Sequence, residues 1–208
     1  MEQPAQLLPP ARVVPMPPSM SLEEYFELEA RNPDGPRYEY YNGEVVAMAG
    51  ASPAHNFITG NVHAFLHNRL RSSSCRVSTA DQRIHIPAKL AYVYADVVAA
   101  CGEWLYQPNS RPAALLNPVL IVEVLSDTTE ARDRGHKFQL YLTIPSLRHY
   151  LLLDADRVAA DLYTRDSEED VWKVRFFNSL PDVLPLPALS AELPLAEAYD
   201  AVRFGEGT

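Results

Sequence analysis

Two acidic residues interrupt apolar runs in this sequence. Asp96 lies within the run 92–100, and Glu123 lies within the run 118–125. A carboxylate inside a buried strand is costly unless a cation, an ion pair or a proton compensates its charge. If the two strands pair, the acids would lie side by side, and one divalent cation such as Mg²⁺ would compensate both, with water and phosphate oxygens as its other ligands. The alternative is that each acid meets an arginine or lies at an exposed strand end.

The local signals around these acids predict a mixed sheet with helices packed against it. Ser21 and Glu24 form a capping box, Asn42-Gly43 is a hairpin turn, and Ser52-Pro53 begins a helix. The expected helices cover residues 22–31, 53–71, 133–143 and a short segment within 195–202. The expected strands cover residues 37–41, 44–49, 75–80, 82–86, 92–100, 118–125, 149–153, 158–164 and 171–177.

The composition fits one ordinary domain. The chain has 208 residues, of which 47% are hydrophobic and 22% charged, close to the averages for globular proteins. The first twenty residues contain six prolines, which predicts a flexible tail over 1–20 and a domain over 21–203. Without a signal-peptide pattern, Cys75 and Cys101 are expected to be reduced, buried thiols of a cytoplasmic protein. A disulfide between them is the alternative.

The net charge of −9 argues against a protein whose main role is to coat nucleic acid, since such proteins have a basic excess. The charge is unevenly distributed, because residues 60–90 carry five Lys or Arg and one acid. One face of the molecule can therefore still meet a phosphate backbone. The alternative is an ordinary acidic protein with a solvated surface.

Several motifs in order resemble one family. They comprise residues 38–46, 52–55, 94–98, 122–126 and 132–137, followed by Tyr141. Together they are similar to the Uma family, a bacterial branch of the PD-(D/E)xK superfamily of restriction endonucleases and related nucleases. The resemblance covers about residues 20–180, and its specificity lies in the ordered set of motifs.

The resemblance implies a restriction-endonuclease-like αβββαβ core with extra C-terminal strands, and a homodimer. It also implies hydrolysis of phosphodiester bonds in nucleic acid, with DNA as the expected substrate. The resemblance places Mg²⁺ or Mn²⁺ at Asp96 and Glu123. Two positions depart from the superfamily pattern. Ala95 replaces the proline of the first motif, which is not a ligand, and Leu125 occupies the position of the superfamily lysine.

Three more residues acquire candidate roles from the resemblance. Lys137 matches a lysine that many relatives supply from the following helix, where it would orient the attacking water and stabilise developing charge. Glu39 is an auxiliary contact to metal or water, and His55 an auxiliary contact to phosphate at a helix N-terminus. The alternatives are a surface lysine for Lys137 and a structural histidine for His55.

The sequence gives little support for other kinds of catalytic or metal site. His63 and His67 have the spacing of a zinc pair but lack the glutamate of HExxH and a third ligand. GxSxG, Walker A and GxGxxG patterns are absent from the sequence. Two hypotheses remain: a metal-dependent nuclease, and a catalytically silent nuclease fold that serves as a binding or assembly module.

Overall fold

The computed structural model describes residues 19–31, 35–48, 50–79, 82–126, 129–166 and 168–204. Its helical segments are α1 (Leu22–Arg31), α2 (Pro53–Leu70), η1 (Pro87–Lys89), α3 (Glu130–Arg132), η2 (Asp133–Lys137), α4 (Phe138–Tyr141), η3 (Pro187–Leu189) and α5 (Leu195–Ala198). Its strands are β1 (Tyr38–Tyr41), β2 (Glu44–Ala47), β3 (Cys75–Thr79), β4 (Arg83–Ile86), β5 (Ala91–Tyr94), β6 (Val97–Cys101), β7 (Ala114–Leu115), β8 (Leu120–Leu125), β9 (His149–Asp154), β10 (Ala160–Arg165), β11 (Trp172–Phe177), β12 (Val183–Leu186) and β13 (Ala191–Pro194). In this part of the chain, the helices are all too short or too polar to cross a membrane.

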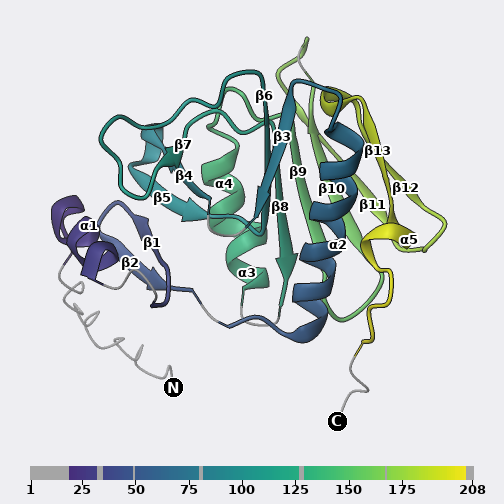
Figure 1. The fold of residues 1–208 in the computed structure, drawn as a ribbon, viewed down its shortest axis with the longest axis horizontal. Helices are drawn as coiled ribbons and strands as arrows, with labels where there is room; N and C mark the ends of the chain where they lie inside the picture. The colour runs from purple at the N-terminus through teal and green to yellow at the C-terminus, as the bar shows by residue number, and fades with distance from the viewer. Residues whose placement is uncertain are drawn as a thin grey trace, which may run out of the picture.

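The strands form two main sheets and a separate hairpin. One sheet has the order β2-β1-β5-β4-β7, the other has the order β11-β10-β9-β8-β6-β3, and β12 pairs with β13. In the second sheet β8 and β9 are parallel, while β6 runs antiparallel to β8. Figure 1 shows the first sheet beside α1 and the second sheet beside α2. The mixed α/β fold predicted from the sequence is confirmed.

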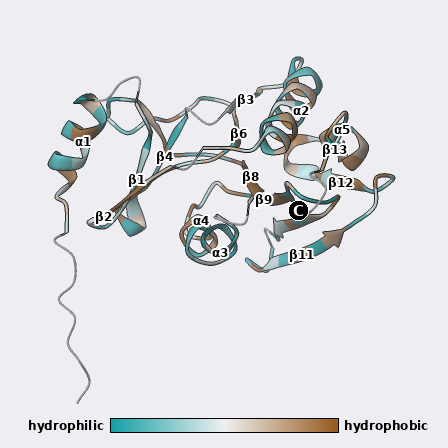
Figure 2. Cartoon of the chain, turned by 90° about the horizontal axis from the view of Figure 1, so that it is seen from below, coloured by the Kyte–Doolittle hydropathy of each residue, from teal (hydrophilic) through white to brown (hydrophobic). Residues whose placement is uncertain are grey.

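The six-stranded sheet has a helix layer on each face. Val97, Val122 and Val124 pack with the buried side of α2. Their neighbours Val98 and Ile121 pack instead with α4 on the other face, as the alternation of side chains along a strand requires. Figure 2 shows α2 and the pair α3 and α4 on opposite sides of this sheet. Glu123 alternates with Val122 and Val124, so it faces the α4 layer.

The local signals in the first fifty residues give the expected elements. The Ser21 hydroxyl accepts from the Glu24 amide at 3.2 Å, and the Glu24 carboxylate accepts from the Ser21 amide at 2.8 Å. Gly43 has a φ of 105°, and a Cβ there would lie 2.7 Å from the Cβ of Ser19. Met20 donates its amide to the Gly43 carbonyl at 2.8 Å. Most of the tail expected over residues 1–20 lies outside the described residues, but its last residue contacts this hairpin.

The single strand expected over residues 92–100 is wrong. The chain leaves the first sheet after Tyr94 and enters the second at Val97, so β5 and β6 belong to different sheets. Both strands are buried on both faces, which made the apolar run continuous in the sequence. The break places Asp96 at the crossing between the two sheets.

The expected reduced thiols are also wrong, because Cys75 and Cys101 form a disulfide. The two residues are direct partners in the antiparallel register of β3 and β6, which brings their side chains together. This pairing removes the cysteine argument for a reducing compartment.

The helix expected over residues 133–143 begins earlier and contains a π-helical turn. It runs from Glu130 to Tyr141 as α3, η2 and α4, and the middle segment η2 is a π-helical turn. Such turns occur mostly as single insertions in α-helices and frequently lie at functional sites. Asp133 and Lys137, at the two ends of this turn, are both buried.

Candidate active site

A cavity of about 390 Å³ lies where the two sheets meet. Segments from the end of β2, the first turns of α2, the crossing from β5 to β6, the end of β8, and α3 with η2 enclose it. Its ionisable lining residues are Glu39, His55, Asp96, Glu123, Arg132, Asp133 and Lys137. All five residues proposed from the sequence therefore line one cavity.

Asp96 is held at the crossing between the sheets by two contacts. Its Oδ2 accepts from the Val124 amide of β8 at 2.7 Å. This bond lies next to the point where β6 begins to pair with β8, at Val97 and Val122. The same oxygen lies 3.2 Å from Nε2 of His55. His55 is in the first turn of α2, where its amide donates to the capping hydroxyl of Ser52. The fold thus fixes Asp96 against β8 and α2 together.

Glu123 is buried on the face of β8 that meets the helical layer. Its Oε1 accepts from the Tyr141 hydroxyl at 2.7 Å and from the Lys137 ammonium at 3.0 Å. Both partners come from the helix that follows β8. Leu125 shares this face of β8 and packs into the apolar cluster beneath α4.

Lys137 is 6% exposed, so the alternative of a surface lysine is wrong. Its ammonium lies 2.9 Å from Oε1 of Glu39 and 3.7 Å from Oδ1 of Asp133, in addition to its contact with Glu123. It also donates to the Tyr94 carbonyl at 3.1 Å. The ammonium therefore joins the first hairpin, the end of β5, β8 and the helix.

Glu39 connects the hairpin to the same centre. Its Oε1 accepts from the Tyr94 amide at 3.1 Å, and its Oε2 accepts from the Tyr41 hydroxyl at 2.5 Å. The hydroxyl of Tyr94 in turn donates to Glu29 of α1 at 2.6 Å. Tyr94 thus fixes both Glu39 and Lys137 through its backbone, while its side chain ties the site to α1.

The electrostatics of the cavity reflect an excess of buried acids. Burial raises the pKa of Glu123 well above its usual range; Lys137 lowers it, and Asp133 and Asp96 raise it further. Burial raises the pKa of Asp133 as well, against the effect of Lys137. Burial alone would lower the pKa of Lys137, but Glu123 and its other neighbours raise it well above its usual range. The lysine therefore stays charged, and the site favours additional positive charge.

The His55 ring is affected by opposing influences. Burial lowers its pKa, but the hydrogen bond to Asp96 and the charges of Asp96 and Asp133 outweigh burial and raise it. Its other ring nitrogen, Nδ1, is buried with no hydrogen-bonding partner among the described residues. In the described structure, one ring nitrogen is therefore hydrogen-bonded to Asp96 and the other has no partner.

The free carboxylate oxygens of this cavity suit a divalent cation that also binds water or substrate oxygens. Oε2 of Glu123 and Oδ1 of Asp96 make no hydrogen bond within the described ranges, and both residues line the cavity. In that part of the chain, no group of three or more His, Cys, Asp or Glu side chains could hold a metal by itself. Two carboxylates are the protein contribution typical for Mg²⁺, whose remaining ligands are water and substrate oxygens. The residues therefore fit such an ion.

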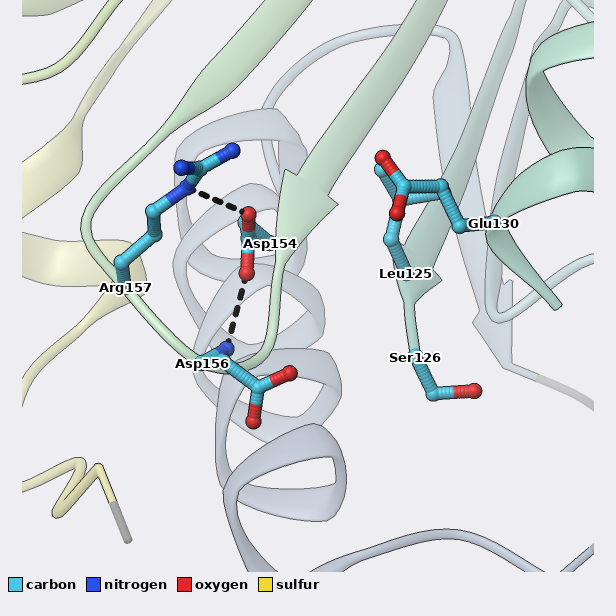
Figure 3. Close-up of a pocket in the computed structure, with 6 residues that line it drawn as sticks. All are labelled: Leu125, Ser126, Glu130, Asp154, Asp156 and Arg157. Carbon is cyan, nitrogen blue, oxygen red and sulfur yellow. Dashed lines mark hydrogen bonds and ion pairs between the residues drawn. The ribbon is translucent and has the colours of Figure 1, made fainter. Parts of the chain in front are cut away.

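A second hollow, of about 220 Å³, opens at the ends of β8 and β9. Figure 3 shows that its central acid, Asp154, is bonded to Arg157 and to the amide of Asp156. Glu130, across the hollow, pairs with Arg134 at 2.7 Å. Its acids are thus partly satisfied by neighbours, and none of the residues proposed from the sequence lines it.

Sequence reasoning did not assign roles to several residues that line the cavity or bond to its acids. Asp133 and Lys137 are four positions apart in the helix, which is a spacing that brings side chains together and was a usable signal. Tyr41 and Tyr94 gave no such signal, because aromatic residues in strands are ordinary core residues. Tyr141 was part of the resembling motifs without a role of its own.

Comparisons with known proteins agree with the family resemblance and with the fold. The family model described as "Uma2: Putative restriction endonuclease" matches residues 22–196. Two uncharacterized proteins of Synechocystis are similar to the chain, one 32% identical over 90% of this chain and 95% of its own length, the other 34% identical over 65% and 75%. A crystal structure from Anabaena variabilis, described as a putative nuclease belonging to DUF820, matches with a TM-score of 0.65 at 13% identity, covering 84% of this chain and 96% of that one.

Proposed function

Because the chain belongs to the Uma2 family, we propose that the cavity is the active site of a Mg²⁺- or Mn²⁺-dependent nuclease that hydrolyses phosphodiester bonds, in DNA first of all. The observation that carries this proposal is the convergence of Glu39, Asp96, Glu123 and Lys137 on one cavity from four separate segments. A purely structural ion pair needs one acid for the lysine, whereas this cavity has four lining carboxylates.

The metal ligands of the proposal are Asp96 and Glu123. A divalent cation there would polarise the phosphodiester and supply a nucleophile at neutral pH by lowering the pKa of water. Each acid has one oxygen committed to the protein and one without a partner among the described residues. The committed oxygens keep the carboxylates in place, and the others are available to a ligand.

Lys137 would stabilise negative charge that develops on the phosphate. Its ammonium is already fixed by Glu39, Glu123 and the Tyr94 carbonyl, so no reorganisation is needed at the moment of reaction. Replacement of this lysine by methionine should lower the rate by ~10²–10³-fold. The affinity for Mn²⁺ should be retained, because the lysine acts on water and phosphate rather than on the ion.

The direct test is hydrolysis of plasmid DNA and of single-stranded DNA by the purified chain with Mg²⁺, Mn²⁺ or EDTA. The matched pair of variants is Glu123→Gln and Glu44→Gln, since Glu44 is an exposed residue of β2 and loses the same charge. Cleavage should require the metal, persist in Glu44→Gln and vanish in Glu123→Gln. Equal cleavage by both variants, or cleavage in EDTA, would show that the assignment is wrong.

A catalytically silent module is the second candidate, and one observation favours it. The Lys137 ammonium has carboxylate or carbonyl oxygens on several sides, which is also the arrangement of a structural ion-pair cluster. This candidate would be supported if the chain bound DNA in the assay above without cleaving it under any metal condition.

We also propose a homodimer, which the resemblance implied. The edge strand β11 supports it, because Phe176 is 72% exposed and Val174 is 40% exposed, and exposed apolar side chains on an edge strand favour association. Light scattering after gel filtration should give twice the mass of the chain. Phe176→Ser should shift the protein toward the monomer if β11 is the interface.

A further inference from the structure

Arg132 brings a guanidinium to the acid-lined cavity. It is the last residue of α3, it lines the cavity and it is half-buried. Its side chain makes no hydrogen bond or ion pair with any residue in the described ranges. The neighbouring Arg134, by contrast, is bonded to Glu130 and Asp161, and Lys137 is bonded to Glu39 and Glu123.

An arginine next to several carboxylates normally pairs with one of them, since an unpaired charge is poorly compensated. Here each of the two acids nearest the sheet crossing already has at least one oxygen bonded to another group. Glu39 is bonded to Lys137, Tyr41 and Tyr94, and Asp96 is bonded to His55 and Val124. Among the described residues, the guanidinium of Arg132 therefore stays unpaired on the wall of a cavity that has four carboxylates.

Arg132 is close enough to the first hairpin for its charge to affect Tyr41. Burial raises the pKa of Tyr41, with Glu39 adding to the rise, and Arg132 is among the charges that lower it. Among the described lining residues, Arg132 is the one Lys or Arg that has no carboxylate partner. Any anion that enters must approach four carboxylates, and Arg132 is the cation available to hold it.

The part of the cavity wall formed by α2 has buried polar atoms without partners among the described residues. Oγ1 of Thr59 and Nδ1 of His55 are both buried, and neither has a hydrogen-bonding partner in the described part of the chain. The two residues are four positions apart on one face of α2, and both line the cavity. Buried polar atoms without partners are rare in proteins, so a bound molecule is a physical explanation for them.

We propose that Arg132 binds a phosphate of the nucleic-acid strand in this cavity, with the Thr59 hydroxyl as a second contact from α2. The choice of nucleic acid as the ligand rests on the proposed function, whereas the anion site itself rests on the geometry. A guanidinium presents paired donors in a plane that matches two phosphate oxygens, which an ammonium does not. Arg132 is in this view a substrate-binding residue, distinct from the acids and from Lys137.

The test measures binding and does not depend on catalysis. A short fluorescent single-stranded DNA is titrated with the Glu123→Gln protein, which has one carboxylate charge fewer and under the proposed function does not cleave. The same titration is repeated with double variants that combine Glu123→Gln with Arg132→Gln, Arg132→Lys or Thr59→Val. The matched control is Arg71→Gln, which loses the same charge at the exposed C-terminal end of α2, ~24 Å along the helix from His55 at 1.5 Å per residue.

Arg132→Gln should weaken binding about tenfold and reduce the slope of log K against log salt by ~0.7, the value for one phosphate contact on a single strand. Arg132→Lys should recover only part of the affinity. Thr59→Val should weaken binding about fivefold, as expected for one hydrogen bond. Arg71→Gln should change it less than twofold, and melting temperatures should show that all variants fold.

The results separate this inference from the proposed function. The role of Arg132 would be overturned if the Arg132→Gln and Arg71→Gln variants bound DNA with equal affinity. It would also be overturned if the Glu123→Gln protein with Arg132 intact did not bind the DNA. Selective loss of binding in Arg132→Gln would support it even if the unmodified chain failed to cleave DNA, in which case only the nuclease proposal would fail. Inorganic phosphate, added as a competitor, distinguishes a site for free phosphate from one for a strand: it should displace the DNA only weakly.

Discussion

Replacing Lys137 by methionine removes the positive charge that three buried acids share. The ammonium lies 2.9 Å from Glu39 and 3.0 Å from Glu123, so each pair has a gross attraction of ~5 kcal/mol at an effective dielectric of 20. The dehydration of the ammonium offsets much of this attraction. Because removal of one partner leaves the remaining charges buried, we expect the free energy of unfolding to fall by ~3–5 kcal/mol.

The loss should depend on pH with a definite sign. The pKa of Glu123 is already raised by burial, and removal of Lys137 must raise it further. The folded variant then binds more protons than the unfolded chain between pH ~4.3 and this raised pKa. Its stability therefore falls as the pH increases through that window, and the difference from the unmodified protein is larger at pH 8 than at pH 5.

Urea denaturation of both proteins at the two pH values, in EDTA, measures this difference. Lys89→Met is the control, because Lys89 is exposed in η1 and its loss should change stability by no more than ~0.5 kcal/mol. The reasoning is refuted if Lys137→Met costs as little as the control, or if its cost is larger at low pH. Either result would mean that the acids are compensated by something other than this ammonium.

Three further predictions concern other parts of the molecule. Asp96→Asn keeps an acceptor for the Val124 amide but loses the charge, so calorimetry with Mn²⁺ should show no binding, whereas the exposed Asp156→Asn should bind normally. Burial lowers the pKa of His149 to about 4, so its contribution to stability should be lost as the pH falls from about 6.5 to about 4, by up to ~3 kcal/mol; a urea series in which His149→Gln has the same pH dependence as the unmodified protein would contradict this. Reduction of the Cys75–Cys101 disulfide, with a sequence separation of 26, should lower the free energy of unfolding by ~2–4 kcal/mol, and unchanged urea curves with and without reductant would show that the bond contributes nothing.

The elements that the sequence predicted well are those with a local physical cause. The capping box at Ser21 and the turn at Asn42-Gly43 depend on a few neighbouring residues, and α1 and the first hairpin follow them closely. By contrast, β12 and β13 were not predicted, because Pro185 and Pro194 lie within a proline-rich stretch that reads as irregular chain. The two strands pair only with each other, which allows prolines that a central strand would exclude.

Non-local features could not be read from the sequence in the same way. The change of sheet between Tyr94 and Val97 does not interrupt the hydrophobic pattern, since β5 is buried throughout and β6 is buried except at its last residue. The disulfide depends on the register of β3 and β6, which no local pattern reveals. The acids were nevertheless found, because a carboxylate in an apolar run needs compensation wherever the strand lies. What the sequence could not give is which groups compensate it.

The position of the lysine shows why the ordered motifs were informative although one of them departs from the superfamily pattern. Under the proposed function the site requires a fixed ammonium at Glu123, and the strand position two residues later is only one way to provide it. Here that position is Leu125, which packs beneath α4, so a lysine there would have to displace apolar contacts. The π-helical turn η2 instead places Asp133 and Lys137 at the same centre, and the ammonium reaches Glu123 from the helix. The physical constraint is on the charge and its distance from the carboxylate, so a site of this kind can keep its electrostatics while its sequence motif changes.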